Sequence, residues 1–103
     1  MKITKTPDGD KLTIALDGRL DTVTSPELEK ELETALEGVS ELTMDFSSLE
    51  YVSSAGLRVL LSAHKSMTGK GGSMKLTHLN EIVGEVLDVT GFSEVLNIVR
   101  EKR

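Results

Sequence analysis

Two adjacent serines, Ser53 and Ser54, are the residues of this chain whose types and position indicate chemistry. They stand between an apolar strand pattern and an apolar helical pattern, and Ala55 and Gly56 follow them. A helix usually begins with one small polar cap and continues with good helix formers, whereas glycine costs about 1 kcal/mol relative to alanine. This local cost predicts that a serine stands exposed at the positive end of a helix, where something large approaches the backbone.

Phosphorylation is the chemistry that such a hydroxyl supports. A phosphate group adds about −1.5 to −2 charge, and a helix N-terminus stabilises it by roughly 0.3–1 kcal/mol. A partner docked on the same small residues would instead bury an unpaired charge, and each decade of affinity corresponds to about 1.4 kcal/mol. The pattern therefore predicts a binding switch. The alternative is purely structural: one serine caps the helix, and the other is simply accommodated at the helix start without a role in function.

The remaining polar residues offer little for catalysis. His64 and His78 are the only histidines, and neither pairs with a carboxylate at metal-ligand spacing. Asp45 ends a predicted strand, where a loop or capping role is more common than a catalytic one. The glycine-rich run 69–73 leads from a helix into a strand, which is the opposite polarity to a phosphate-binding loop. We therefore expect no enzyme, no metal and no cofactor.

The composition is that of a single soluble domain spanning residues 1–103, with 38% hydrophobic and 28% charged residues. The chain has no cysteine, which excludes disulfides and thiolate metal sites. A net charge of −5 argues against nucleic acid as a partner. No apolar run approaches the ~18 residues of a membrane span, and no signal peptide is recognisable. We expect a cytoplasmic protein, as a monomer or a weak dimer.

Charge is distributed unevenly along the chain. Eight acidic residues and one lysine lie between residues 27 and 50, whereas residues 51–80 contain no acid and four basic residues. This segregation fits two solvated faces. The alternative is a surface that steers a charged partner.

The first half of the chain predicts a hairpin and a helix. A strand near Ile3, the turn 7–10 and the alternating strand 11–17 form an antiparallel pair that ends at Gly18. A helix follows, capped either by Ser25 before Pro26 or by a Thr24–Glu27 capping box, and it ends at Gly38. Its outer face is acidic.

The second half predicts alternating strands and helices. Strand 41–46 leads through a polar loop into helix 54–68, and strand 73–77 leads into a helix between Asn80 and Gly91. The expected core-facing stripe of helix 54–68 is Leu57, Leu60, Leu61, His64 and Met67 or Thr68. Residues 95–99 fit a strand or a helical turn, and 100–103 a charged tail. This order indicates an α/β fold with a mixed sheet, an N-terminal antiparallel hairpin, parallel β-α crossovers and helices packed on the sheet.

These motifs together resemble the STAS domain family, and within it the bacterial anti-sigma factor antagonists. The resemblance covers the whole chain and rests on Gly18-Arg19-Leu20-Asp21, the Ser-Pro-Glu-Leu helix start, Met44-Asp45-Phe46 and Tyr51-Val52-Ser53-Ser54-Ala55-Gly56-Leu57. Matched residue by residue, Ser54 takes the place of the family's phosphorylated serine. Ser53 stands where the family often has aspartate, and Ala55 where it often has serine or threonine. Ser53 is therefore an alternative acceptor.

The resemblance implies a partner-switching protein that is a substrate and not an enzyme. The unphosphorylated form would bind an anti-sigma factor that is itself a serine kinase, and so release a sigma factor. Phosphorylation at Ser54 would end that binding, and a PP2C-type phosphatase would restore it. The partner-binding residues implied are Asp21, Ser53, Ser54, Ala55, Gly56, Leu57 and Arg58.

Two other functions stay open from the sequence. One is a STAS-type subunit without phosphorylation, which binds a small ligand or belongs to a transport complex. The weaker one is a nucleotide-hydrolysing enzyme.

Overall fold

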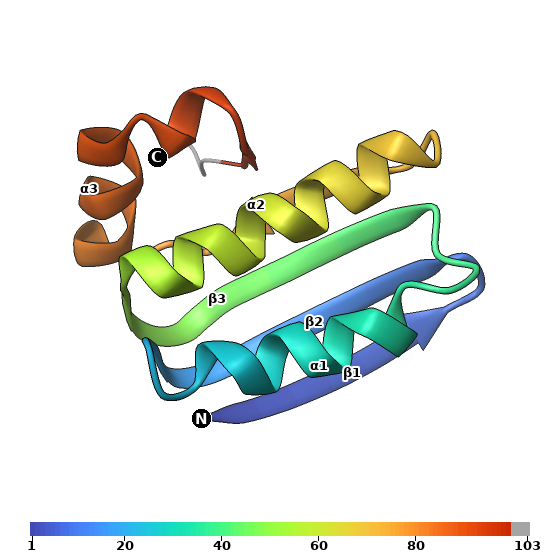
Figure 1. Ribbon diagram of the computed structural model, residues 1–103, viewed down its shortest axis with the longest axis horizontal. Coiled ribbons are helices and arrows are strands. Elements are labelled where there is room, and N and C mark those ends of the chain that lie inside the picture. The colour runs from blue at the N-terminus through green and yellow to red at the C-terminus, as the bar shows by residue number, and fades with distance from the viewer. Residues whose placement is uncertain (100–103) are drawn as a thin grey trace.

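A five-stranded sheet with the order β1-β2-β3-β4-β5 forms the centre of the fold (Figure 1). The computed structural model describes residues 1–99. The strands are β1 (Lys2–Asp8), β2 (Lys11–Leu20), β3 (Glu41–Val52), β4 (Ser73–Thr77) and β5 (Asn97–Ile98). β1 runs antiparallel to β2, and every other neighbouring pair is parallel. The predicted mixed sheet with an N-terminal hairpin is therefore confirmed.

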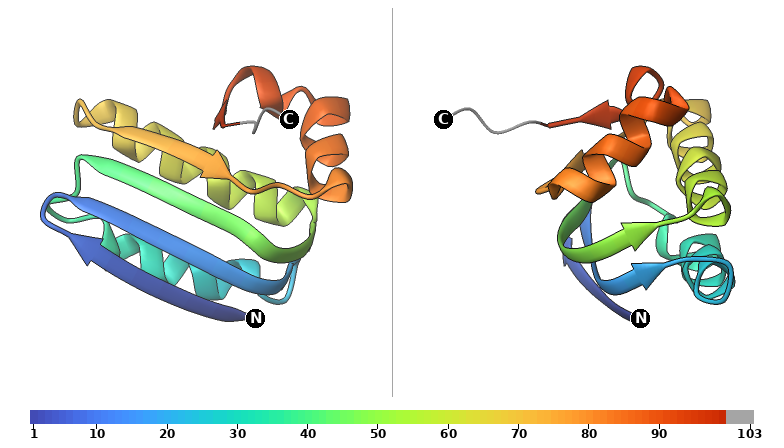
Figure 2. Two further views of the ribbon diagram at one scale, coloured as in Figure 1. Left: turned by 180° about the vertical axis from the view of Figure 1, so that it is seen from behind. Right: turned by 90° about the vertical axis from the view of Figure 1, so that its left-hand side faces the viewer.

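The helices α1 (Ser25–Ala35) and α2 (Ser54–Gly69) lie side by side on one face of the sheet (Figure 2). The helix α3 (Glu81–Thr90) lies at the end of the sheet where α2 begins. Alternate residues of β3 show which face is covered, because Leu42 and Met44 are buried whereas Thr43 and Asp45 are partly exposed. The opposite face of the sheet carries the partly exposed residues.

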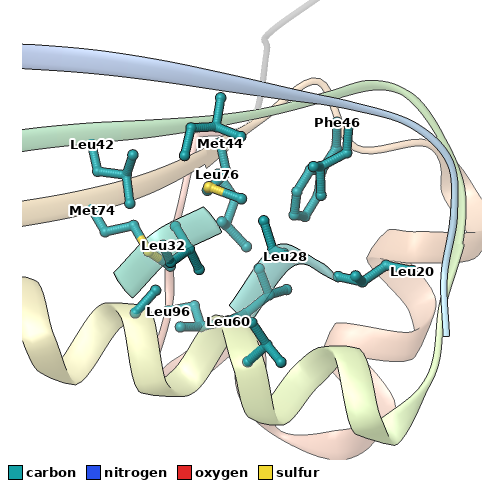
Figure 3. Packing of buried hydrophobic residues seen from close by; sticks show 14 of the residues in the cluster. Leu20, Leu28, Leu32, Leu42, Met44, Phe46, Leu60, Met74, Leu76 and Leu96 are labelled. Carbon is teal, nitrogen blue, oxygen red and sulfur yellow. The ribbon is translucent and has the colours of Figure 1, made fainter. Parts of the chain in front are cut away.

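The core between sheet and helices is built almost entirely from leucine, valine, isoleucine and methionine. Phe46 is the one aromatic residue among the fully buried side chains of residues 1–99. Its ring points from β3 toward the helices, into the space around Leu28 of α1 (Figure 3). Leu60 of α2 is also fully buried in this cluster. The sheet face and the two helices therefore share one continuous core.

The predicted polar loop after residue 46 is wrong, because β3 continues to Val52. Leu49 and Val52 are 1% and 0% exposed, so buried side chains continue through this segment, at every third position instead of every second. The register of β3 against β2 shifts twice, between the pairs at Ala15 and Asp17 and between those at Gly18 and Arg19. Such bulges bend a strand without ending its pairing. β2 likewise continues beyond Gly18, to Leu20.

The predicted core-facing stripe of α2 is confirmed in part, because Leu57, Leu60 and Met67 are buried. Leu61 and His64 are only partly buried and Thr68 is exposed, whereas Val59 and Ala63 are buried. The physical reason is that α2 packs against α1 as well as against the sheet, which turns the buried stripe toward α1. Hydrophobic spacing along one helix does not specify on which side a neighbouring helix lies.

The helix ends are partly as predicted. Neither predicted cap of α1 forms: Ser25 is inside the helix, and Thr24 at the N-cap makes no side-chain capping bond. Asn80 does cap α3, and Gly91 ends it with a φ of 82°. A 3₁₀ turn (Phe92–Glu94) then leads toward β5, so within the ambiguous segment 95–99 the strand alternative holds for Asn97 and Ile98. The predicted charged tail, residues 100–103, lies outside the described residues.

Candidate functional site

The two serines have different structural roles. Ser53 is the N-cap of α2, with extended backbone angles, and its Oγ accepts a hydrogen bond from the N–H of Gly56 at 3.4 Å. Ser54 is the first residue of the helix and is exposed. The interpretation that one serine caps the helix therefore holds for Ser53. The hydroxyl of Ser54 is available for chemistry.

The reason for Gly56 is internal packing, which corrects our expectation that it lets a partner approach the backbone. Gly56 is buried, and a Cβ there would lie 2.7 Å from Cγ of Leu20 and 2.9 Å from both the Leu20 carbonyl oxygen and Cγ2 of Val52. At distances below 3.0 Å something must shift, and the Leu20 carbonyl oxygen belongs to the backbone. Only glycine therefore lets α2 begin this close to the end of β2.

The remaining predicted contact residues fall into two groups. Leu57 is 3% exposed, so this side chain and Gly56 support the surface from beneath. Ala55 is partly buried, and Arg58 is exposed. Because Arg58 follows Ser54 by four residues, both side chains lie on the same side of the helix, one turn apart. Of the predicted set on α2, Ser54 and Arg58 thus form the accessible surface.

The electrostatics of this helix end favour an added negative charge. The first turn of α2 contains no acidic residue. The first N–H groups of a helix have no partner within the helix, and the aligned peptide dipoles make this end positive. Arg58 adds a full positive charge one turn away. A phosphate on Ser54 would meet backbone donors, the dipole and a guanidinium group.

Asp21, on the loop between β2 and α1, lies at the same corner of the molecule. Its carboxylate accepts hydrogen bonds from the N–H groups of Val23 at 3.0 Å and Thr24 at 3.1 Å. The hydrogen bond from the Thr24 N–H is the main cause that holds the pKa of the Asp21 carboxyl below its ordinary value. The N–H of Ser53 donates to the carbonyl of Leu20 at 2.9 Å, which ties this loop to the start of α2.

Sequence reasoning missed the role of an aromatic residue and a cation at this corner. The guanidinium of Arg19 lies 4.6 Å from the ring centre of Tyr51, and its Nε is 3.8 Å from the carboxylate of Asp21. Val23, on the same loop as Asp21, is 82% exposed. Both Arg19 and Tyr51 belong to the motifs quoted above, but no local pattern in the sequence indicates that β2 and β3 pair this far.

The other candidate residues have structural roles. The Asp45 carboxylate accepts from the N–H of Ser47 at 3.0 Å and lies 3.3 Å from Nδ1 of His78. Burial raises the pKa of the Asp45 carboxyl, but the Ser47 hydrogen bonds and His78 outweigh that effect and leave it below its ordinary value. The run 69–73 closes α2, where the N–H of Gly72 donates to the Met67 carbonyl at 2.8 Å.

Residues 1–99 contain no group of three or more histidine, cysteine, aspartate or glutamate side chains placed to hold a metal ion. Within the same part of the chain, no helix is both long enough and apolar enough to cross a membrane.

Comparison with known proteins identifies the family. The sequence profile of the STAS domain matches residues 1–102. The chain belongs to the STAS domain family. This STAS domain is 30% identical over 103 residues to BtrV of Bordetella bronchiseptica, which carries the name of an anti-sigma factor antagonist, and the match covers 99% of this chain and 89% of BtrV. The assignment made from the sequence motifs is thus confirmed.

Solved structures support the same fold. An anti-sigma factor antagonist by name from Thermotoga maritima superposes with a TM-score of 0.86 at 22% identity, over 96% of this STAS domain and 86% of that chain. The Bacillus cell fate determinant SpoIIAA, in its phosphorylated form, superposes with a TM-score of 0.74 at 17% identity, over 97% and 93% of the two chains. The architecture described above is therefore that of known STAS proteins.

Proposed function

We propose that this protein is an anti-sigma factor antagonist whose binding to its partner is switched off by phosphorylation of Ser54. The observation that carries the proposal is the exposed Ser54 hydroxyl at a helix N-terminus without an acid in its first turn. Family membership and the similarity to BtrV support the general role. Ser54 is the better acceptor of the two serines, because the Ser53 hydroxyl is partly buried and caps the helix.

The proposed cycle has three partners. The unphosphorylated protein binds an anti-sigma factor that is also a serine kinase, and a sigma factor is released. The kinase transfers a phosphoryl group from ATP to the Ser54 hydroxyl, the hydroxyl proton is lost, and ADP leaves. A PP2C-type phosphatase hydrolyses the phosphoserine and returns the free hydroxyl. The STAS domain is a substrate in this cycle, and its own residues supply the docking surface.

The switch follows from what surrounds Ser54 in each state. In the free protein the phosphate is solvated and contacts the helix N-terminus and Arg58, so the fold accepts it. In the complex the same phosphate would be enclosed against the partner, where an unpaired charge costs several kcal/mol. About 3 kcal/mol corresponds to a loss of affinity of roughly 100-fold. Phosphorylation therefore changes binding and leaves folding intact.

Binding of two Ser54 variants to the cognate anti-sigma factor tests this function. Ser54→Asp is expected to weaken binding by about 100-fold or more, and Ser54→Ala to bind as the unmodified protein does. Ser73→Asp, at an exposed serine where β4 begins, is the control for the added charge and should leave affinity unchanged. Isothermal titration calorimetry gives the dissociation constants. Equal affinity of Ser54→Asp and Ser54→Ala would refute the switch.

Mass spectrometry after incubation with the kinase and ATP locates the modification. We expect one phosphate on Ser54 and none on Ser54→Ala. A phosphate on Ser53 would move the switch by one residue. If neither serine is modified while the kinase phosphorylates a known substrate, this protein is a STAS-type binding subunit without phosphorylation.

A further inference from the structure

A groove of about 190 Å³ lies between α1 and α2, on the outer side of the two helices. Its apolar lining comes from Leu32 and Leu36 of α1 and from Val59 and Ala63 of α2. The hollow exists because α2 presents small side chains to α1 over two turns. Protein interiors are usually filled to the density of organic crystals, so an open hollow between two packed helices is a candidate binding site.

The rim of the groove carries negative charge. Glu29 and Glu33 of α1 line it and are exposed, and neither makes an ion pair within residues 1–99. Glu31 of the same helix differs, because Lys5 binds its carboxylate at 2.6 Å. Ser62 and Ser66 of α2 also line the groove, and their hydroxyls can form hydrogen bonds. The groove thus combines an apolar lining with two unpaired carboxylates.

A lysine or arginine side chain matches this combination. Both have an aliphatic stem that packs on apolar surface and a cationic head that stays near water. The stem would lie on Leu32 and Val59, and the head would reach the carboxylates of Glu29 and Glu33. An acidic or purely apolar side chain would leave the two carboxylates repelled or unpaired.

We propose that this groove receives a lysine or arginine side chain of the anti-sigma factor that docks over Ser54. The identity of that partner rests on the proposed function. The two surfaces are continuous, since the groove residue Ser62 follows Arg58 by one turn, on the same exposed side of α2 as Ser54. Their charges are opposite, with a positive helix end at Ser54 and carboxylates in the groove. A partner with the complementary pattern can bind in one orientation only.

Charge removal at the groove is the first test. The double variant Glu29→Gln with Glu33→Gln is expected to bind the anti-sigma factor about five- to tenfold more weakly in ~0.1 M salt, and the difference should shrink at ~1 M salt. The control double variant is Glu37→Gln with Glu85→Gln, which removes the same net charge at exposed positions that do not line the groove. It should stay within about twofold of the unmodified protein.

Filling the groove is the second test, because it changes no charge. Ser66→Leu places a larger side chain over the lining, and leucine is a good helix former, so α2 should fold. We expect a loss of affinity of about tenfold or more, with an unchanged urea unfolding midpoint.

The outcomes separate the two proposals. If Ser54→Asp loses binding while both groove variants bind as the controls do, the groove proposal is wrong and the proposed function stands. If Ser54→Asp binds as tightly as Ser54→Ala, the proposed function is wrong. Loss of binding in the groove variants but not in the charge control supports the groove.

Discussion

Two helices of this domain, α2 and α3, begin at the same end of the sheet but differ in the groups that offset the positive charge of their N-termini. At α3, the Asn80 side chain accepts from the N–H of Val83 at 2.7 Å, and Glu81 places a carboxylate in the first turn. At α2, the corresponding bond from Gly56 to Ser53 is 3.4 Å long, and the first turn holds no acid. One helix end is neutralised by its own chain, whereas the other is not.

The difference shows where a negative charge can be added. A phosphate at the start of α3 would lie beside Glu81 and be repelled. A phosphate on Ser54 takes the position that a helix N-terminus usually reserves for an acidic residue. The absence of acids in residues 51–80, read from the sequence as a charge segregation, has this local meaning. The first turn of α2 is therefore suited to a negative charge that phosphorylation adds and dephosphorylation removes.

The two helices also differ in the packing of a glycine in their first turns, and this difference predicts the largest effect on stability. Gly56→Ala should lower the free energy of unfolding by about 1–3 kcal/mol, because its Cβ would overlap Leu20 and Val52. Gly84→Ala should raise it by about 0.5–1 kcal/mol, because a Cβ at Gly84 meets no atom within 4 Å and alanine is the better helix former. Urea unfolding measures both. A Gly56→Ala protein as stable as the original would contradict the close packing of α2 on β2.

The caps predict an intermediate effect. Asn80→Ala should cost about 1 kcal/mol, because it removes the short cap to Val83 and the bond that Asn80 Nδ2 donates to the Leu49 carbonyl at 3.0 Å. Ser53→Ala should cost about 0.5 kcal/mol or less, since the bond it removes is long. Thermal unfolding at matched buffer conditions gives both values. A larger cost at Ser53 than at Asn80 would reverse the comparison.

The charges at the first helical position predict the smallest effect. Ser54→Asp should stabilise the free protein by about 0.3–1 kcal/mol, and Glu81→Gln should destabilise it by a similar amount, because each changes the charge at a helix N-terminus. Both differences should fade in about 1 M salt. Denaturant midpoints at low and high salt measure them. If Ser54→Asp destabilises the protein, the start of α2 does not favour an added anion.

The parts of this fold that local sequence signals specify were predictable. Alternating apolar residues predicted the hairpin, Asn80 and Gly91 marked the ends of α3, and small residues marked the start of α2. Within the candidate site, Ser53 and Ser54 were found for the same reason, since capping chemistry depends on neighbours in the chain. Their separate roles needed the geometry, because either hydroxyl could serve as the cap.

Features that depend on contacts between distant segments were not predictable. Residues 47–51 are polar enough to indicate a loop, but pairing with β2 and the burial of Leu49 keep them in the sheet. Gly56 was predicted to let a partner approach the backbone, because the sequence does not show that Leu20 packs against this glycine. The groove between α1 and α2 depends in the same way on how two helices pack.

The two bulges of β3 have a consequence for how the chain tolerates changes in length. From Asp45 to Val52, β3 advances seven residues while its partner β2 advances five from Ala15 to Leu20. In a regularly paired strand the loss of one residue turns every later side chain over. The first bulge, however, lies between the buried residues Phe46 and Leu49, which are three positions apart. Deletion of Ser47 or Ser48 would bring them two positions apart, so Leu49 and Val52 would still face the core. The deletion would instead remove a bend in β3, which changes the direction in which the strand delivers the start of α2 and Ser54.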